Sequence, residues 1–235
     1  MASQYLFVLC PPYCGSTLLW KLLATSERVS ALPQEGQFLP EVEPIMRERP
    51  WDRDLQLPWG DIKATWERYW DASKPVLLEK SPPNIVRATT IAEHFVPAQF
   101  IIMVRNPYAH AEGLIRRNEW PLRRAANFAL MCLRTQAENA AKLNDTLVFT
   151  YEDLVSNPPA ACAQLAAFQP ALDDMDPEAS FEVHSVDGTL DRQITDLNAK
   201  KIEALSPEQL AELNSYFEPN KDTLAHWGYE IIHSP

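Results

Sequence analysis

A glycine and two hydroxyl side chains stand together in the sequence where a strand pattern gives way to a helix pattern. The apolar run at 6–9 is typical of a buried strand, and the leucines of 18–23 have helical spacing. Gly15 lets the backbone approach a ligand closely, while Ser16 and Thr17 offer hydroxyl donors. The first amides of a helix have no acceptor within it and lie at the positive end of its dipole. We therefore expect this turn to bind a phosphate or sulfate anion.

The same turn lacks the pattern of an ATP- or GTP-binding loop. Such loops carry a lysine between their last glycine and a Ser or Thr, whereas Ser16 follows Gly15 directly. Cys10 stands where the first glycine of those loops would be. The candidate carboxylates for a metal ion in phosphoryl transfer are Glu152 and Asp153, and neither makes a convincing site. A kinase of this loop class is therefore disfavoured.

Bulk composition limits the function classes. The 235 residues and 46% hydrophobic content favour a single domain over 1–235 with a sizeable core. A net charge of −11 disfavours nucleic acid or an anionic membrane as the main partner. The 4 cysteines form no ligand cluster, so we expect free thiols and no metal site. The sequence does not start with a basic segment followed by a long apolar one, which predicts a cytoplasmic protein.

Apolar runs alternate with helical patterns along the chain. After 6–9, the runs at 75–78, 99–104 and 146–149 are continuous, as in strands that are buried on both faces of a sheet. Helical patterns cover 85–95, 108–117, 122–143, 158–168 and 206–217. This order predicts an α/β fold, with a doubly wound parallel sheet flanked by helices and a mostly helical C-terminal third.

Two segments interrupt this alternation. Segment 32–74 is rich in proline and tryptophan, so we expect an excursion with short helices over the end of the sheet. Its tryptophans, at 51, 59, 66 and 70, are interpreted chiefly as packing groups, with acceptor binding as the alternative. Segment 184–200 has a glycine at 188 and mixed polar residues, which predicts a surface loop able to close over a ligand.

Polar residues follow the predicted strands. In a doubly wound sheet, ligands bind beyond the carboxyl ends of the strands. After the first strand this edge carries the turn at 12–17, and after later strands it carries the polar segments 79–81 with Lys80, 105–106 with Arg105, and 151–153. We expect these groups to gather at one edge of the sheet and to form the site there.

Five blocks of the sequence, in order, resemble the sulfotransferases that use 3′-phosphoadenosine 5′-phosphosulfate (PAPS), particularly compact bacterial and tyrosylprotein-type members. PPYCGSTLLWKLL resembles their 5′-phosphosulfate loop, and FIIMVRNPYAHAEGLIRR resembles their 3′-phosphate strand and helix. The other matching blocks are EKSPPN, FTYEDLVSNP and LSPEQLAELNSYFEPNKDTLAHWGYE. The resemblance spans most of the chain. It implies a P-loop-type fold, PAPS as donor, 3′-phosphoadenosine 5′-phosphate (PAP) as product, and no obligatory metal.

The resemblance also implies roles for particular residues. The phosphosulfate would lie on the loop residues Pro12, Tyr13, Cys14, Gly15, Ser16 and Thr17. Arg105 would clamp the 3′-phosphate, since a planar guanidinium binds phosphate through two donors; an ion pair at the end of a strand is the alternative. Arg192, in segment 184–200, would close over the nucleotide, with an ordinary surface arginine as the alternative. No histidine is assigned a catalytic role.

Two residues depart from the family pattern. Tyr13 stands where the family usually has a Lys or Arg aimed at the bridging oxygen, and Gly113 stands where it usually has a Ser for the 3′-phosphate. Lys80 is predicted to replace the missing loop cation, with a surface ion pair to Glu35 or Glu79 as the alternative. Glu35 lies 20 residues after Gly15, about where the tyrosylprotein-type branch has a catalytic Glu, and is predicted to be the general base, with a solvated loop carboxylate as the alternative.

Two hypotheses about function follow. The first is a PAPS-dependent sulfotransferase that moves a sulfonyl group by in-line displacement to a hydroxyl or amine of a small molecule, saccharide or peptide. The second, which Tyr13 and Gly113 motivate, is a PAP- or PAPS-binding protein that has lost catalysis. Both predict nucleotide binding, and only the first predicts transfer. Neither specifies the acceptor or an oligomeric state.

Overall fold

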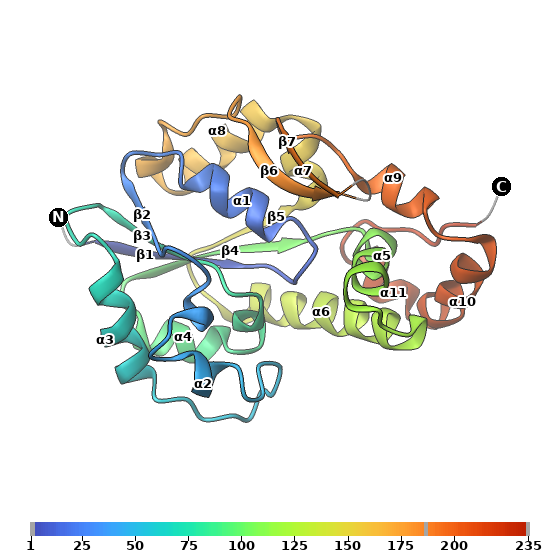
Figure 1. Ribbon diagram of the computed structural model, residues 1–235, viewed down its shortest axis with the longest axis horizontal. Coiled ribbons are helices and arrows are strands. Elements are labelled where there is room, and N and C mark those ends of the chain that lie inside the picture. The colour runs from blue at the N-terminus through green and yellow to red at the C-terminus, as the bar shows by residue number, and fades with distance from the viewer. Residues whose placement is uncertain (1–2, 186–187, 234–235) are drawn as a thin grey trace.

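A five-stranded parallel sheet forms the centre of the protein (Figure 1). A computed structural model describes residues 3–185 and 188–233 of the chain. The strands are β1 (Gln4–Leu9), β2 (Val29–Ala31), β3 (Val76–Glu79), β4 (Ala98–Val104) and β5 (Thr146–Thr150). Their order in the sheet is β2-β3-β1-β4-β5, so β1 is central. The chain passes from β1 to the edge strand β2, returns to β3, and then crosses β1 to add β4 and β5 on the other side. The predicted α/β fold is confirmed.

Helices cover both faces of the sheet. The helices are α1 (Ser16–Leu23), α2 (Glu43–Met46), α3 (Trp59–Tyr69), α4 (Ala88–His94), α5 (Pro107–Asn118), α6 (Leu122–Lys142), α7 (Tyr151–Ser156), α8 (Pro158–Phe168), α9 (Asn198–Glu203), α10 (Pro207–Phe217) and α11 (Lys221–Ala225). In Figure 1, α1, α7 and α8 lie on one face, and α3, α4 and α6 lie on the other. The C-terminal helices gather with α5 beyond one end of the sheet. Among the residues that the structure describes, every helix is too short or too polar to span a bilayer.

The side chains of β1 show why this strand lies at the centre. Leu6 and Val8 pack in a core cluster with α1 and α8, and Phe7 and Leu9 pack in a second cluster with α3 and α4. All four are at most 1% exposed. A strand whose two faces are both covered needs apolar residues at every position rather than at alternate ones. The continuous apolar run at 6–9 in the sequence therefore reflects burial on both faces of the sheet.

Segment 32–74 forms the predicted excursion with helices. It contains a 3₁₀ turn at Gly36–Phe38 followed by α2 and α3. Trp59, Trp66 and Trp70 are buried, and each has its ring within 6.5 Å of the Phe95 ring. The packing interpretation is therefore correct for these three. Trp51 is different, because it is only partly buried and lines the pocket described below.

Segment 184–200 is more regular than the predicted surface loop. Strands β6 (Phe181–Ser185) and β7 (Gly188–Arg192) pair as a two-stranded antiparallel sheet, and α9 begins at Asn198. The loop prediction was therefore wrong for most of the described residues of this segment; residues 186–187 lie outside the described part, and closure over a ligand stays a prediction. Alternation of apolar and polar residues, as in Phe181, Glu182 and Val183, is the pattern of a strand with one covered face. The mixed polar composition of the segment conceals that period.

Candidate active site

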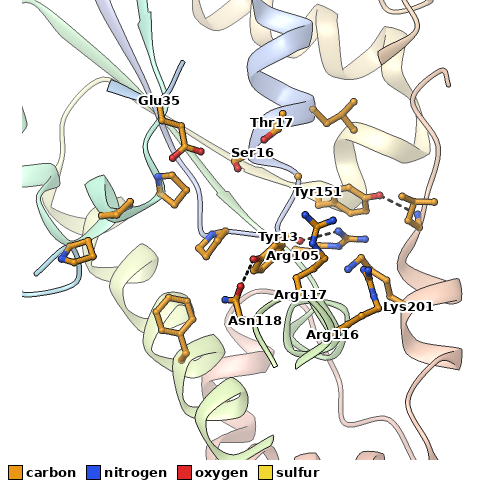
Figure 2. Close-up of a pocket in the computed structure, with 18 of the residues that line it drawn as sticks. Tyr13, Ser16, Thr17, Glu35, Arg105, Arg116, Arg117, Asn118, Tyr151 and Lys201 are labelled. Atoms are coloured by element: carbon orange, nitrogen blue, oxygen red, sulfur yellow. Dashed lines mark hydrogen bonds between the residues drawn. The ribbon is translucent and has the colours of Figure 1, made fainter. Parts of the chain in front are cut away.

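The carboxyl ends of the strands meet at one pocket, as the order of the polar residues predicts. The pocket has a volume of about 520 Å³ and is lined by the loop after β1, by Arg105 after β4 and by Tyr151 after β5. Glu35 lines it from the excursion, and Lys201 lines it from α9. Figure 2 shows Glu35 on one side of this pocket and Arg105, Arg116, Arg117 and Lys201 on the other, with Ser16 and Thr17 between them.

The loop after β1 is a glycine turn that opens directly into α1. Gly15 is the N-cap and has φ 91°, a left-handed conformation, and no side chain caps the helix. A Cβ at Gly15 would lie 2.6 Å from Cδ2 of Tyr151, so a side chain there would also clash. Ser16 and Thr17 occupy the first turn and line the pocket. The uncapped amides and hydroxyls suit an anion at this point.

Cys14 and Pro12 differ in how they face the pocket. Pro12 lines it, whereas the Cys14 side chain is 1% exposed and packs in the core cluster beneath the loop. Burial raises the pKa of the Cys14 thiol above its usual range. The predicted contact of Cys14 with a ligand is therefore restricted to its backbone, because the turn directs the apolar thiol inward.

Tyr13 turns its side chain onto α5. Its backbone has φ 62°, and its hydroxyl donates a 2.5 Å hydrogen bond to Oδ1 of Asn118. A Cβ placed on Gly113 of α5 would lie only 2.8 Å from Cβ of Tyr13. The two departures from the family pattern are therefore in contact with each other. Sequence spacing gives no sign of this, since residues 13 and 113 meet only in the folded chain.

Arg105 is buried at the pocket with one donor unused. It is 4% exposed, its Nε donates to Oδ1 of Asn198 at 2.7 Å, and its Nη1 donates to the Tyr13 carbonyl oxygen at 3.1 Å. The guanidinium lies 3.7 Å above the centre of the Tyr151 ring. Among the side chains that the structure describes, Nη2 has no hydrogen-bond partner and no carboxylate pairs with Arg105. The described contacts therefore give no support to the ion-pair alternative, and a buried nitrogen remains for a ligand.

Lys80 and Glu35 meet beside the loop. Nζ of Lys80 lies 2.6 Å from Oε1 of Glu35 and 3.5 Å from Oγ1 of Thr17, and the Lys80 side chain is 5% exposed. Oε2 of Glu35 accepts a 2.6 Å hydrogen bond from Nε2 of Gln37. Lys80 does pair with Glu35, as the alternative stated, but it is buried rather than at the surface. Glu35 and Thr17 also line a second cavity of about 280 Å³, and it is this cavity that Lys80 faces.

A buried carboxyl, which the sequence places at this edge of the sheet without a role of its own, holds the segment that carries Glu35. Glu79 is 1% exposed; its Oε1 accepts from the Gly36 amide at 3.0 Å and from the Ser81 hydroxyl, and its Oε2 accepts from Nδ2 of Asn84 at 2.6 Å. Burial raises the pKa of Glu79 to about 7, although the hydrogen bonds oppose that rise. Its signal in the sequence was its position beside Lys80 at the end of a strand.

Lys201 is a pocket residue that sequence reasoning missed. It rises from α9 and is 4% exposed, and its Nζ lies 2.7 Å from Oε2 of Glu112, which also pairs with Nε of Arg116. Burial, and then the charge of Arg105, lower the pKa of Lys201 to about 8. No pattern in the sequence marks it, because only the packing of α9 on α5 brings it to the pocket.

Two further residues complete the comparison with the sequence. His110 is 2% exposed, and burial lowers its pKa to about 3, so it stays neutral and supports the Pro12 backbone. Arg192 ends strand β7, and its side chain lies outside the described part of the chain.

Within the described ranges, no group of three His, Cys, Asp or Glu side chains is arranged to hold a metal ion.

Aromatic side chains from the excursion, from α6 and from the turn before α6 form another wall of the pocket. The rings of Trp51 and Trp120 each pack edge-on against Phe128, at centroid distances of 4.8 and 5.2 Å. Phe38 follows Glu35 by one turn, and the guanidinium of Arg47 lies 4.5 Å above its ring centre. This wall joins the excursion to α6 and leaves an apolar surface beside the Glu35 carboxylate.

Comparisons with known proteins agree with the fold and identify the family. The sequence model of the sulfotransferase family matches residues 5–170. The sulfotransferase domain from the curacin biosynthetic pathway is 20% identical, with a TM-score of 0.65 over 98% of this chain and 99% of that one. A sulfotransferase from Alicyclobacillus acidocaldarius is 14% identical, with a TM-score of 0.60 over 97% and 96% of the two chains. Mouse sulfotransferase SULT7A1, complexed with PAP, is 11% identical, with a TM-score of 0.56 over 92% and 84%. No curated protein sequence matches the chain.

Proposed function

Since the chain belongs to the sulfotransferase family, we propose that it transfers a sulfonyl group from PAPS to a hydroxyl or amine acceptor and releases PAP. One observation carries the proposal. The uncapped start of α1, the unused donor of Arg105 and the Lys80–Glu35 pair lie around one group of adjoining cavities. Anion binding, nucleotide binding and proton transfer therefore have suitable groups within one site.

The nucleotide is proposed to bind along the ends of β1 and β4. The amides and hydroxyls at the start of α1, with Ser16 and Thr17, would hold the 5′-phosphosulfate. The free Nη2 of Arg105 would bind the 3′-phosphate, while its other donors keep the guanidinium on the Tyr151 ring. The mouse neighbour, which was solved with PAP, supports the choice of ligand.

The proposed reaction is an in-line displacement at sulfur. A bond forms from the acceptor oxygen or nitrogen to sulfur, while the bond from sulfur to the 5′-phosphate oxygen breaks and its electron pair stays on PAP. Glu35 would take the acceptor proton, because its carboxylate lines the pocket and keeps lone pairs beyond those that Lys80 and Gln37 use. Lys80, beside Thr17, would stabilise the negative charge that develops on the leaving oxygen.

The acceptor is proposed to lie against the aromatic wall. Phe38, Trp51, Trp120 and Phe128 offer flat apolar faces on the excursion side of the pocket. An acceptor molecule that packs against this wall would direct its hydroxyl or amine toward Glu35. A small molecule or one aromatic side chain of a peptide suits these faces, and a sugar ring can stack on them as well.

A second function is favoured by one specific observation. Tyr13 carries no charge, and its hydroxyl is already bonded to Asn118, so it cannot stabilise the leaving oxygen as the usual loop Lys or Arg would. Loss of one such contact costs roughly 10²- to 10³-fold in rate. If Lys80 does not compensate, the protein binds PAP or PAPS without catalysing transfer.

Ligand-dependent stability and transfer assays separate these proposals. A ligand that binds only the folded state raises the melting temperature, so PAP and PAPS should raise it more than ATP or GTP do. Transfer of labelled sulfonate to a panel of phenols, alcohols, saccharides and tyrosine peptides should then be detected. A PAP-dependent shift without transfer would identify the binding protein, and the absence of any PAP-dependent shift at high concentration would contradict both functions.

A further inference from the structure

Two segments of the chain meet residue by residue at the Glu35 carboxylate. The residues at the end of β3 contact the 3₁₀ turn of the excursion in hydrogen-bonded pairs, which are Glu79 with Gly36, Lys80 with Glu35, and Ser81 with Gln37. In the two outer pairs a side-chain oxygen accepts a backbone amide, at 3.0 Å for Gly36 and 3.2 Å for Gln37. The middle pair joins two charged side chains. The outer pairs therefore hold the backbone that directly follows Glu35.

Gly36 is held at both of its backbone polar groups. Its amide donates to Oε1 of Glu79, and its carbonyl oxygen accepts from Nε1 of Trp66 at 3.2 Å. A Cβ at Gly36 would lie 2.6 Å from Cε2 of Trp66, so the glycine lets the backbone lie directly on the indole ring. Gly36, Glu79 and Trp66 are all buried, where a hydrogen bond is stronger than in water. The residue after Glu35 is thus fixed in place.

Glu79 and Ser81 also support each other. The Ser81 hydroxyl donates to Oε1 of Glu79, and Nδ2 of Asn84 donates to Oε2 at 2.6 Å. Loss of the Glu79 oxygens would therefore leave the donors of Gly36, Ser81 and Asn84 without this acceptor, which is costly for buried groups. Neither Glu79 nor Ser81 lines either cavity, whereas Glu35 lines both. The two residues can therefore affect reacting groups only through the segments that they hold.

We infer that Glu79 and Ser81 are positioning residues for sulfonyl transfer, which fix the Glu35 carboxylate between the two cavities through the Gly36 and Gln37 amides. The inference rests on the proposed function, in which Glu35 takes the acceptor proton. A general base acts over hydrogen-bond distance, and a displacement of about 1 Å costs roughly 10²-fold in rate. Loss of either holding group should therefore lower kcat and leave the binding of both substrates nearly unchanged.

A pair of variants at position 79 tests the inference. The acceptor is the phenol, alcohol, saccharide or tyrosine peptide that the wild type sulfonates fastest. Glu79→Met keeps the length of the side chain but removes both acceptor oxygens, so kcat and the single-turnover rate should fall roughly 10- to 100-fold. Glu79→Gln keeps an oxygen for the Gly36 amide and should recover most of that loss. The Kd for PAP and the KM for the acceptor should change by no more than a few-fold in either variant.

A second pair of variants covers the case in which Glu79→Met does not fold. Ser81→Ala removes the acceptor of the Gln37 amide and should also lower kcat, by a smaller factor because Glu79 still holds Gly36. Ser26→Ala is the matched control. Ser26 is 3% exposed, its hydroxyl also accepts a backbone amide, that of Arg28 at 3.1 Å, and it lies outside both cavities. It should lose comparable stability in urea unfolding and keep the wild-type kcat.

Combination with Glu35→Gln shows whether the effect passes through the base. If Ser81 acts by positioning Glu35, Ser81→Ala should not slow the Glu35→Gln variant further. The inference is overturned if Ser81→Ala and every folded variant at position 79 keep the wild-type kcat, or if the losses are equal with and without Glu35. It is also overturned if Glu35→Gln itself keeps the wild-type rate, or if PAP binding weakens as much as transfer does.

The failure of this inference can be told apart from that of the proposed function. Any of the overturning results, with transfer still catalysed by the wild type, leaves the proposed sulfonyl transfer intact. Absence of transfer by the wild type across the whole acceptor panel would instead refute the catalytic function, and this inference with it.

Discussion

The Lys80 ammonium lies 2.6 Å from the Glu35 carboxylate and 3.5 Å from the Thr17 hydroxyl. The three residues come from the end of β3, the excursion and the first turn of α1. The cation thus stands at the glycine turn whose own position 13 carries none. Because the Lys80 side chain is 5% exposed, solvent screens its charge far less than that of a surface lysine. This arrangement makes Lys80 the group to test first.

Lys80→Gln should reduce the rate of sulfonyl transfer with little effect on nucleotide affinity. If Lys80 stabilises the leaving oxygen, its loss removes an interaction that is strongest in the transition state, and kcat should fall roughly 10²- to 10³-fold. The Kd for PAP should change by no more than a few-fold. Lys74→Gln is the matched control, because Lys74 lies outside both cavities and donates to the Glu27 carbonyl. Equal rates for wild type and Lys80→Gln would contradict the role.

Glu35→Gln should also slow transfer while the protein still binds PAP. The amide keeps the shape of the side chain but cannot accept the acceptor proton, and loss of a general base typically costs roughly 10²- to 10⁴-fold. Single-turnover transfer measures this step directly. Glu41→Gln serves as control, since Glu41 is exposed and pairs with Arg68 away from the pocket. A variant that retains the wild-type single-turnover rate would show that another group takes the proton.

The contact between Gly113 and Tyr13 predicts that the effect of Gly113→Ala on the free energy of unfolding changes sign when Tyr13 is replaced. Alanine is favoured over glycine inside a helix by about 1 kcal/mol, but at 113 its Cβ would overlap Tyr13. Overpacking costs about 1–3 kcal/mol, so Gly113→Ala should destabilise the wild type. In a Tyr13→Gly background the same change should stabilise. Urea unfolding gives both values, and their difference is the coupling energy.

Gly60→Ala is the control for that cycle. Gly60 lies in α3, and nothing lies within 4 Å of a Cβ placed there, so the substitution should stabilise the protein by about 0.5–1 kcal/mol with or without Tyr13. Additive effects at 13 and 113 would mean that the two side chains do not compete for the same space.

The sequence predicts the parts of the site that depend on local pattern. The strand, glycine turn and helix around Gly15 follow one another along the chain, and polar residues such as Lys80 and Arg105 come directly after apolar runs. Parallel strands then place these residues at one edge without further information. The short strand β2 and the pair β6 and β7 were not predicted, because three residues or a mixed polar composition give little periodic signal.

The rest of the site depends on contacts between distant elements. Lys201 reaches the pocket because α9 packs on α5, and its partner Glu112 lies 89 residues earlier in the chain. Tyr13 and Gly113 each depart from the family pattern, yet only the fold shows that they touch. The direction of the Cys14 side chain likewise follows from the left-handed backbone on either side of it, at Tyr13 and Gly15. Such tertiary relations leave no regular spacing in a single sequence.

The raised pKa of Glu79 makes the free energy of unfolding depend on pH. Burial raises its pKa from the usual 4.5 to about 7, so between these values the folded protein binds a proton that the unfolded chain has released. The contribution of Glu79 to stability is therefore fully present below pH 4.5 and is lost as the pH rises through 7. Each pKa unit corresponds to about 1.4 kcal/mol, so the loss across this range is roughly 3 kcal/mol.

Glu79→Gln should remove this dependence while preserving most of the hydrogen bonds. The amide oxygen can still accept from the Gly36 amide and the Ser81 hydroxyl, and the new NH₂ can donate to Oδ1 of Asn84, which lacks a partner among the described residues, once the Asn84 amide turns over. Urea unfolding from pH 4.5 to 8 should therefore give a flatter stability curve for Glu79→Gln than for the wild type. Glu41→Gln should keep the wild-type slope there, because hydrogen bonds lower the Glu41 pKa and place its titration below this range. Parallel curves for wild type and Glu79→Gln would show that Glu79 is ionised throughout and that it holds Gly36 as a carboxylate.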